Sequence, residues 1–160
     1  MRFFLALCIA SVFLTGCGND SRVYEEIHDF EHREWLVADK PEFEFVITNV
    51  YTKYNLYGDV RNSVAYPFSR FFFTYYLQDS TGTELQKNLM TEYLFDVRTA
   101  KPTGSSGIGD LYDHQFLLLK DYQFKNPGKY KVVFEQFMRM DTLPGIMAVG
   151  LRVEKANRVN

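Results

Sequence analysis

The chain has 160 residues and a formal net charge of −2 at pH 7, and this length suits one ordinary domain with a sizeable core. The charge balance gives no reason to expect nucleic acid or a strongly anionic partner surface. Aromatic residues make up 17% of the sequence, and this composition favours β-sheet because such side chains fit pleated, half-buried surfaces.

The beginning of the chain has the pattern of a secretory signal that ends in a cysteine. Arg2 supplies a positive charge, and the apolar run 3–14 has the length of a signal-peptide core. This run is too short for a membrane-spanning helix, which needs about 20 residues. Leu14-Thr15-Gly16-Cys17 resembles a bacterial lipobox. That resemblance implies cleavage before Cys17, a diacylglycerol on its sulfur, and a third acyl chain such as palmitate on the new amine. The alternative is an ordinary secretory signal with an accidental cysteine.

This interpretation divides the chain into four segments. They are a lipoprotein signal peptide (1–16), the lipidated cysteine with a short tether (17–22), a β-sandwich domain (23–154) and a C-terminal tail (155–160). Cys8 would leave with the signal and Cys17 would be acylated, so the mature domain has neither a free thiol nor a disulfide. The membrane is then an expected partner, through the acyl chains on Cys17.

Apolar and polar residues alternate along several segments, which is typical of half-buried strands. Residues 23–35 are expected to be extended, with Trp35 against the body of the domain. Alternation predicts strands at 42–48, 54–61, 69–78, 112–119, 130–140 and 146–153. Only a short connection containing Pro144-Gly145 separates the last two, which should pair as an antiparallel hairpin. The sequence therefore predicts an all-β fold, an antiparallel, jelly-roll-like β-sandwich of seven or eight strands.

Two segments are less regular. Leu85, Leu89 and Tyr93 recur every four residues within 83–95, which permits either one long strand or a short helix. Residues 96–110 are rich in glycine and serine, so they are expected to form the longest loop.

No combination of residues predicts an enzyme or a cofactor site. His28 and His32 are four residues apart, but a zinc site needs a third protein ligand. Asp110, Asp113 and His114 follow the glycine-rich loop without the spacing of a calcium-binding loop, and a hydrolase built on them is the weakest hypothesis. A small-molecule ligand is not expected either.

Apolar residues also occur on the second face of the strongest strand. Within 69–78, Phe71, Phe73, Tyr75 and Leu77 share one face, while Phe72 and Tyr76 lie on the other. A strand that is apolar on both faces is usually covered on both, so burial of the second face is the preferred interpretation. The alternative is a partner-docking or glycan-binding surface that includes Phe72, Tyr76, Phe137 and Arg139.

Short blocks along the body of the chain resemble one known family. They include Glu34-Trp35, Pro41-Glu42-Phe43, Arg61-Asn62-Ser63, Tyr66-Pro67, Tyr75-Tyr76-Leu77-Gln78-Asp79, Gly107-Ile108-Gly109-Asp110, Gly128-Lys129-Tyr130 and Gln136-Phe137-Met138-Arg139-Met140-Asp141. Their order and spacing, together with the lipobox, resemble the GldH family of gliding-motility lipoproteins from Bacteroidota.

The resemblance implies a membrane-anchored, non-enzymatic lipoprotein needed for surface gliding and tied to the type IX secretion machinery. Its expected partners are other envelope proteins of that apparatus. Only the role of Cys17, as the acylated residue, transfers from the family to this chain. Gly18 rather than aspartate follows Cys17, which allows transport to the outer membrane. The residues after Gly18 are not an acidic run, which favours the periplasmic face of that membrane over the cell surface. The alternative function is a glycan-binding β-sandwich module of the cell envelope.

Overall fold

The computed structural model describes residues 21–156, so the predicted signal peptide and Cys17 lie outside the described range. Within this range the strands are β1 (Arg22–Asp29), β2 (Glu34–Leu36), β3 (Glu42–Ile47), β4 (Tyr54–Ser63), β5 (Arg70–Asp79), β6 (Glu84–Tyr93), β7 (Ser105–Ser106), β8 (Leu111–Tyr122), β9 (Gly128–Gln136), β10 (Thr142–Pro144) and β11 (Ile146–Lys155). A 3-10 helix, η1, spans Glu31–Arg33. None of these described elements is a helix long and apolar enough to cross a bilayer.

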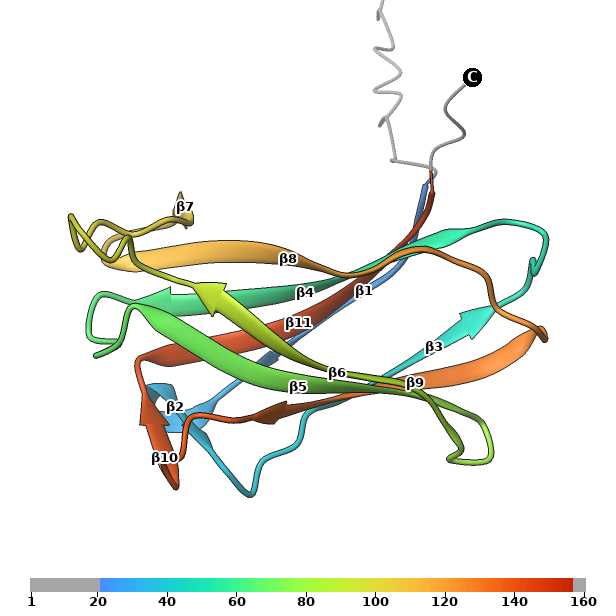
Figure 1. Ribbon diagram of the computed structural model, residues 1–160, viewed down its shortest axis with the longest axis horizontal. Helices are drawn as coiled ribbons and strands as arrows, with labels where there is room; N and C mark the ends of the chain where they lie inside the picture. Colours follow the sequence, from blue (N-terminus) through green and yellow to red (C-terminus); the bar gives the residue numbers. More distant parts are fainter. Residues whose placement is uncertain (1–20, 157–160) are drawn as a thin grey trace, which may run out of the picture.

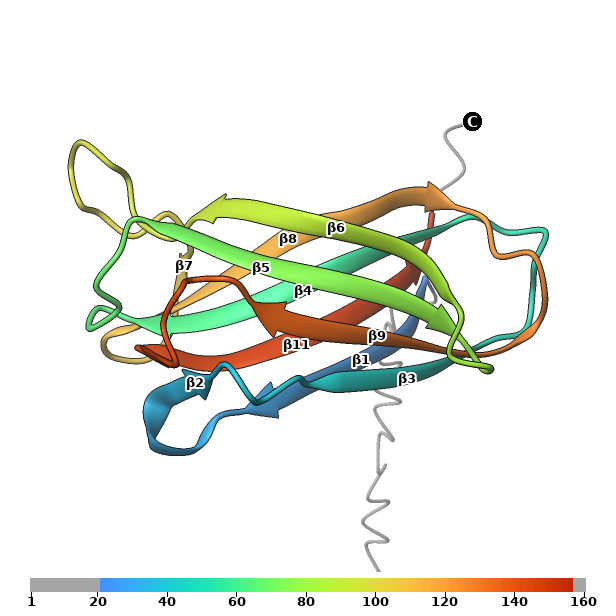
Figure 2. The ribbon, with the colours of Figure 1, turned by 60° about the horizontal axis from the view of Figure 1, so that its bottom comes forward.

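The strands form two facing antiparallel sheets (Figures 1 and 2). The first sheet has the order β1-β11-β4-β8-β7 and the second has the order β3-β9-β5-β6. A small ladder of β10 and β2 closes one end. The predicted all-β antiparallel sandwich is therefore confirmed.

Alternation of side chains decides which face of each strand enters the core. In β3, Phe43, Phe45 and Ile47 are buried while the residues between them are exposed. In β4 alternate residues are also buried, and the space for Leu118 comes from Gly58. A Cβ atom at Gly58 would lie 3.2 Å from the Cδ2 atom of Leu118.

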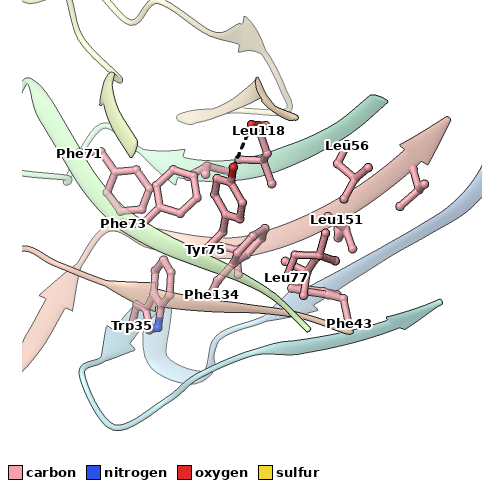
Figure 3. Close-up of a cluster of buried hydrophobic side chains, with 14 of the residues drawn as sticks. Trp35, Phe43, Leu56, Phe71, Phe73, Tyr75, Leu77, Leu118, Phe134 and Leu151 are labelled. Carbon is pink, nitrogen blue, oxygen red and sulfur yellow. Dashed lines mark hydrogen bonds between the residues drawn. The ribbon is translucent and has the colours of Figure 1, made fainter. Parts of the chain in front are cut away.

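The core between the sheets is mostly aromatic (Figure 3). Trp35 is fully buried, as predicted, and its ring stacks on Phe30 at 5.0 Å between centroids. Its indole Nε1 donates a hydrogen bond to the carbonyl oxygen of Asp39 at 2.8 Å, which satisfies the polar edge of the ring. Tyr75 links the two sheets, because its hydroxyl donates to the carbonyl oxygen of Leu118 on β8 at 3.1 Å.

The prediction that residues 23–35 form one extended segment is wrong in its second half. The chain turns at η1, where His32 and Arg33 have positive φ angles of 55° and 61°. This turn brings Phe30 and Trp35 onto the same side of the chain, so that their rings can stack.

The segment that permitted a helix or a strand is the strand β6, paired with β5. A spacing of four residues is even, so this pattern fits one face of a regular strand as well as one face of a helix. β6 is an edge strand, which is why both of its faces remain largely exposed. The periodicity alone therefore did not distinguish the two structures.

The predicted terminal hairpin is wrong. β9 pairs with β3 and β5 in the second sheet, whereas β11 pairs with β1 and β4 in the first. The connection between them crosses from one sheet to the other and contributes β10, which buries Leu143. The Pro144-Gly145 turn exists, but it joins β10 to β11.

The glycine-rich segment after β6 is a long connection, as predicted, although it is partly ordered by pairing. Phe95 and Pro102 form an isolated bridge, and β7 pairs with β8. Gly104 packs against His114, since a Cβ atom there would lie 2.7 Å from the imidazole ring.

Candidate functional site

An apolar hollow lies on the outer face of the second sheet. Phe72 comes from β5, and Phe137 immediately follows β9. The backbone N–H of Phe137 donates to the carbonyl oxygen of Phe72 at 2.9 Å, which holds the two residues side by side. The hollow has a volume of about 400 Å³ and is lined by Phe72, Leu89, Phe137, Met138 and Arg139. We call these five residues the apolar hollow.

The preferred interpretation, burial of this second aromatic face, is wrong for its central residue. Phe137 is 55% exposed and Leu89 is 46% exposed, while Phe72 is half-buried. The fold has two layers, so the outer face of β5 has no third layer above it in the described part of the chain. The strand is central within its sheet but covered on one side only.

The segment after β9 is held by a network around Gln136. The side-chain Oε1 of this buried residue accepts a hydrogen bond from the backbone N–H of Met138 at 2.9 Å, and its Nε2 donates to the carbonyl oxygen of Met140 at 2.7 Å. Arg139 then adopts a left-handed conformation with a φ of 54°, which is uncommon for a residue with a side chain. The sharp turn presents Phe137 and Arg139 outward.

Tyr76 lies on the same face but belongs to a neighbouring polar cluster. Its hydroxyl donates a hydrogen bond to Glu135, and Glu135 is paired with Lys40 at 2.7 Å. The ammonium group of Lys87 lies over the Tyr76 ring at 4.8 Å from its centroid. The bond to the Glu135 carboxylate, followed by burial, raises the pKa of Tyr76 to about 12. The Lys40 ammonium and the Tyr76 hydroxyl hold the pKa of Glu135 below its usual value.

The structure thus brings three of the four predicted surface residues together, and places the fourth beside them. Leu89 and Met138 complete the hollow, and neither was predicted to do so. Leu89 carried a usable signal, because its four-residue spacing placed it on one face of either possible element. Met138 carried none, since its position depends on the turn after β9.

Among the other candidate residues, His28 and His32 line the same hollow, which has a volume of about 390 Å³. His28 is exposed on β1, whereas His32 lies in η1. No group of three or more His, Cys, Asp or Glu residues in the described range is placed to hold a metal ion.

Asp113 and His114 point to opposite faces of β8, as adjacent strand residues must. The Asp113 carboxylate pairs with Arg61 at 2.7 Å on the outer face. The His114 Nε2 lies 2.8 Å from the Oδ1 of Asn62, and burial lowers the pKa of this imidazole. Asp110, at the start of the same region, accepts a backbone hydrogen bond from Val64 through its carbonyl oxygen. The three residues therefore have separate structural roles.

A second, more polar hollow lies on the outer face of the first sheet. Its volume is about 300 Å³, and its lining includes Glu25, Asp59, Arg61, Asp113 and Gln115. Gln115 donates to the Asp59 carboxylate at 2.9 Å, while burial raises the pKa of this carboxyl group above its usual value. Two of the three lining carboxylates are ion-paired, Asp113 with Arg61 and Glu25 with Arg22.

Several solved structures match this chain with low similarity. One is the VP2 subviral particle of infectious bursal disease virus, at 13% identity and a TM-score of 0.35. The match covers 95% of this chain and 37% of that chain, so this chain spans less than half of the viral protein.

Curated relatives match over nearly the whole chain. The gliding motility lipoprotein GldH of Flavobacterium johnsoniae is 28% identical, covering 93% of this chain and 94% of its own length. The GldH homolog of Christiangramia forsetii is 29% identical, with 97% of both chains covered. The family model described as GldH lipoprotein matches residues 22–153. This chain therefore belongs to the GldH family of gliding-motility lipoproteins, which are membrane-anchored proteins of the cell envelope.

Proposed function

We propose that this protein is a non-enzymatic lipoprotein, acylated on Cys17, that docks other envelope proteins of the gliding apparatus onto its apolar hollow. The observation that carries the proposal is the exposed aromatic side chain of Phe137 at the centre of that hollow. An exposed cluster of large apolar side chains on a soluble domain marks an interaction surface.

The lining of the hollow has the composition of a protein interface. Aromatic residues, methionine and arginine are enriched in such interfaces, and this hollow consists of two phenylalanines, a leucine, a methionine and an arginine. Arg139 is exposed and forms no ion pair with another described residue. The complementary partner segment would therefore present an apolar side chain next to a carboxylate.

The same lining fits a glycan less well. Sugars bind through stacking combined with several hydrogen bonds, whereas this hollow offers one polar side chain. The alternative glycan-binding function is therefore the second choice.

The proposal also includes the membrane anchor, the membrane to which it attaches and a link to the secretion machinery. Two or more acyl chains give stable anchoring, whereas a single chain is marginal. Gly18 after Cys17 allows transport to the outer membrane, and the absence of an acidic run after it favours a domain that faces the periplasm. The likeness to gliding-motility lipoproteins supports a link to the type IX secretion machinery.

Site-specific photocrosslinking in intact cells tests the docking surface. A photoreactive phenylalanine at position 137 should crosslink to an envelope protein, and the same probe at Ile108 should not. Ile108 is the matched control, because it is exposed and apolar, lies between β7 and β8, and does not line the hollow. Phe137→Asp should abolish gliding in a complemented deletion strain, while Ile108→Asp should not.

Charge reversal identifies the partner by its chemistry. Arg139→Glu should weaken the crosslink at least about tenfold, and an acidic-to-arginine change in the crosslinked partner should restore it. Arg98→Glu, in the loop after β6, is the matched control. Full motility of a strain carrying Phe137→Asp would overturn the docking function. Binding of peptidoglycan fragments to the wild-type protein that is lost in the Phe137→Asp variant would favour the glycan alternative.

A further inference from the structure

The two ends of the described chain leave the sandwich at the same place. The backbone N–H of Lys155 donates to the carbonyl oxygen of Ser21 at 2.7 Å. The N–H of Ala156 then donates to the carbonyl oxygen of Lys53 at 2.8 Å. Figure 1 shows this exit toward one end of the long axis, near the loop between β3 and β4.

Two loops are attached to this exit. The loop 48–53 connects β3 to β4, and Gln123 donates a hydrogen bond from its Nε2 to the carbonyl oxygen of Val50 at 3.1 Å. Together, Ser21, the loop 48–53, residues 123–125 and residues 155–156 form a continuous surface that we call the tether end.

An aromatic side chain projects from the tether end. Tyr51 is 90% exposed, although its turn is well ordered. Its backbone N–H donates to the Oδ1 of Asn49 at 2.9 Å, and the hydroxyl of buried Tyr54 donates to the carbonyl oxygen of Asn49 at 2.7 Å. Tyrosine is enriched where proteins meet the headgroup region of a bilayer, because its ring is apolar and its hydroxyl is polar.

Exposed lysines accompany this tyrosine. Neither Lys53 nor Lys125 forms an ion pair with another residue in the range 21–156, and Lys155 lies beside them. Among residues 21–156 the acidic residues nearby are Asp121 and Glu154, and Glu154 is paired with Arg152.

The length of chain before Ser21 limits the distance to the bilayer. Cys17 precedes Ser21 by four residues, which span at most about 14 Å when fully extended. Acyl chains on Cys17 would hold that residue at the headgroups. The tether end would then lie within about two headgroup layers of the membrane.

We propose that the tether end is a second, non-covalent membrane contact, in which Lys53 and Lys125 bind anionic phospholipid headgroups and Tyr51 enters the interfacial layer. This inference rests on the proposed acylation of Cys17. It adds an orientation, because it turns the tether end toward the bilayer and leaves the apolar hollow away from it.

Fluorescence quenching in vesicles measures that orientation. The acylated protein has no other thiol, so Tyr51→Cys or Ile108→Cys provides a single labelling site. The two positions are matched, at 90% and 93% exposure, and the loops that contain them, β3–β4 and β7–β8, lie toward opposite ends of the fold (Figure 1). In vesicles of phosphatidylethanolamine and phosphatidylglycerol (7:3) with a headgroup quencher, the label at position 51 should be quenched at least about twofold more than the label at position 108.

Charge reversal tests the headgroup contact separately. The label is moved to Asn126, an exposed position next to Lys125, so that Tyr51 is retained. Each lysine near an anionic surface changes the contact equilibrium about fivefold. Lys53→Glu with Lys125→Glu should therefore reduce the fraction of domains in contact at least about tenfold. The control pair, Arg98→Glu with Lys101→Glu in the loop after β6, should leave the fraction of domains in contact unchanged. Neither pair of changes should alter sedimentation with the vesicles.

The outcomes separate the two proposals. Protein that sediments with vesicles but is quenched equally at positions 51 and 108 overturns the orientation and leaves the anchor intact. Quenching that survives both the lysine reversal and 0.5 M salt overturns the headgroup contact, because electrostatic contacts at a surface are screened at that ionic strength (Debye length of about 4 Å). Failure to sediment with vesicles overturns the acylation of Cys17 and this inference together.

Discussion

At the residue scale, His114 shows how neighbouring candidates acquire unrelated roles. It is buried between Asn62 and Gly104, whereas Asp113 is on the outer face with Arg61. Burial disfavours the charged imidazole, so the pKa of His114 lies below its ordinary value of 6.5. The folded protein therefore binds fewer protons than the unfolded chain between that lowered pKa and pH 6.5.

This difference predicts a pH dependence of stability. The contribution of neutral His114 is fully present above pH 6.5 and is lost as the pH falls toward the folded-state pKa. Urea unfolding should show wild-type stability falling between pH 7.5 and 5.5, by at most about 1.4 kcal/mol per pH unit from this residue. His114→Gln should remove most of that loss, and the exposed control His28→Gln should retain it. Equal losses in wild type and His114→Gln would contradict the assignment.

At the element scale, the turn between β10 and β11 allows the chain to change sheets. Gly145 has a φ of +81°, and its backbone packs against Tyr66 so closely that a Cβ atom would lie 2.5 Å from the Tyr66 nitrogen. The N–H of Gly145 also donates to the carbonyl oxygen of Arg33 at 2.9 Å. The glycine is therefore required both by its conformation and by its neighbours.

Gly82 allows the effect of the positive φ angle to be measured without the effect of close neighbours. Its φ is +83°, but no atom lies within 4 Å of the position of its missing Cβ. Gly82→Ala should cost about 1–2 kcal/mol, from the left-handed conformation alone. Gly145→Ala should cost at least about 2 kcal/mol more, because backbone atoms must shift. Chemical denaturation of both variants checks this, and similar losses would show that the close approach to Tyr66 is unimportant.

At the scale of the whole molecule, the tether end and the apolar hollow lie apart. The chain leaves beside β1 and β11, whereas the hollow is near the start of β5 and the end of β9, toward the other end of the second sheet (Figure 1). A net charge of −2 gave no indication of an anionic partner surface, because the fold gathers lysines at one end. An average over the sequence cannot reveal such a local cluster.

The short tether should matter for this arrangement. A flexible linker of 20 Gly and Ser residues inserted between residues 20 and 21 would allow an average separation of about 25 Å. Membrane fractionation should be unchanged, while quenching at position 51 should fall and gliding should weaken. The same linker added after residue 160 is the control. Unchanged quenching with the inserted linker would show that the tether end binds lipid without help from a short tether.

The sequence by itself determined the fold class and most strands, because alternation is a local property and one buried face is enough to specify it. Within the predicted strand 42–48, for example, the alternating residues Phe43, Phe45 and Ile47 form the buried face. The family was also recognisable from ordered blocks of residues. The surface residues Phe72, Phe137 and Arg139 were named as one of two alternatives, since parity placed the first of them opposite the core face.

Only the tertiary structure decided which strands share a sheet and which faces are covered. Pairing between β9 and β3, or between β11 and β1, joins residues far apart along the chain. Local sequence patterns do not specify which distant strands pair. The same limit explains why burial of Phe137 was preferred wrongly, since exposure depends on whether a third layer exists. The hollow, the gathered lysines and the shared exit of both chain ends are likewise consequences of non-local packing, which no single segment encodes.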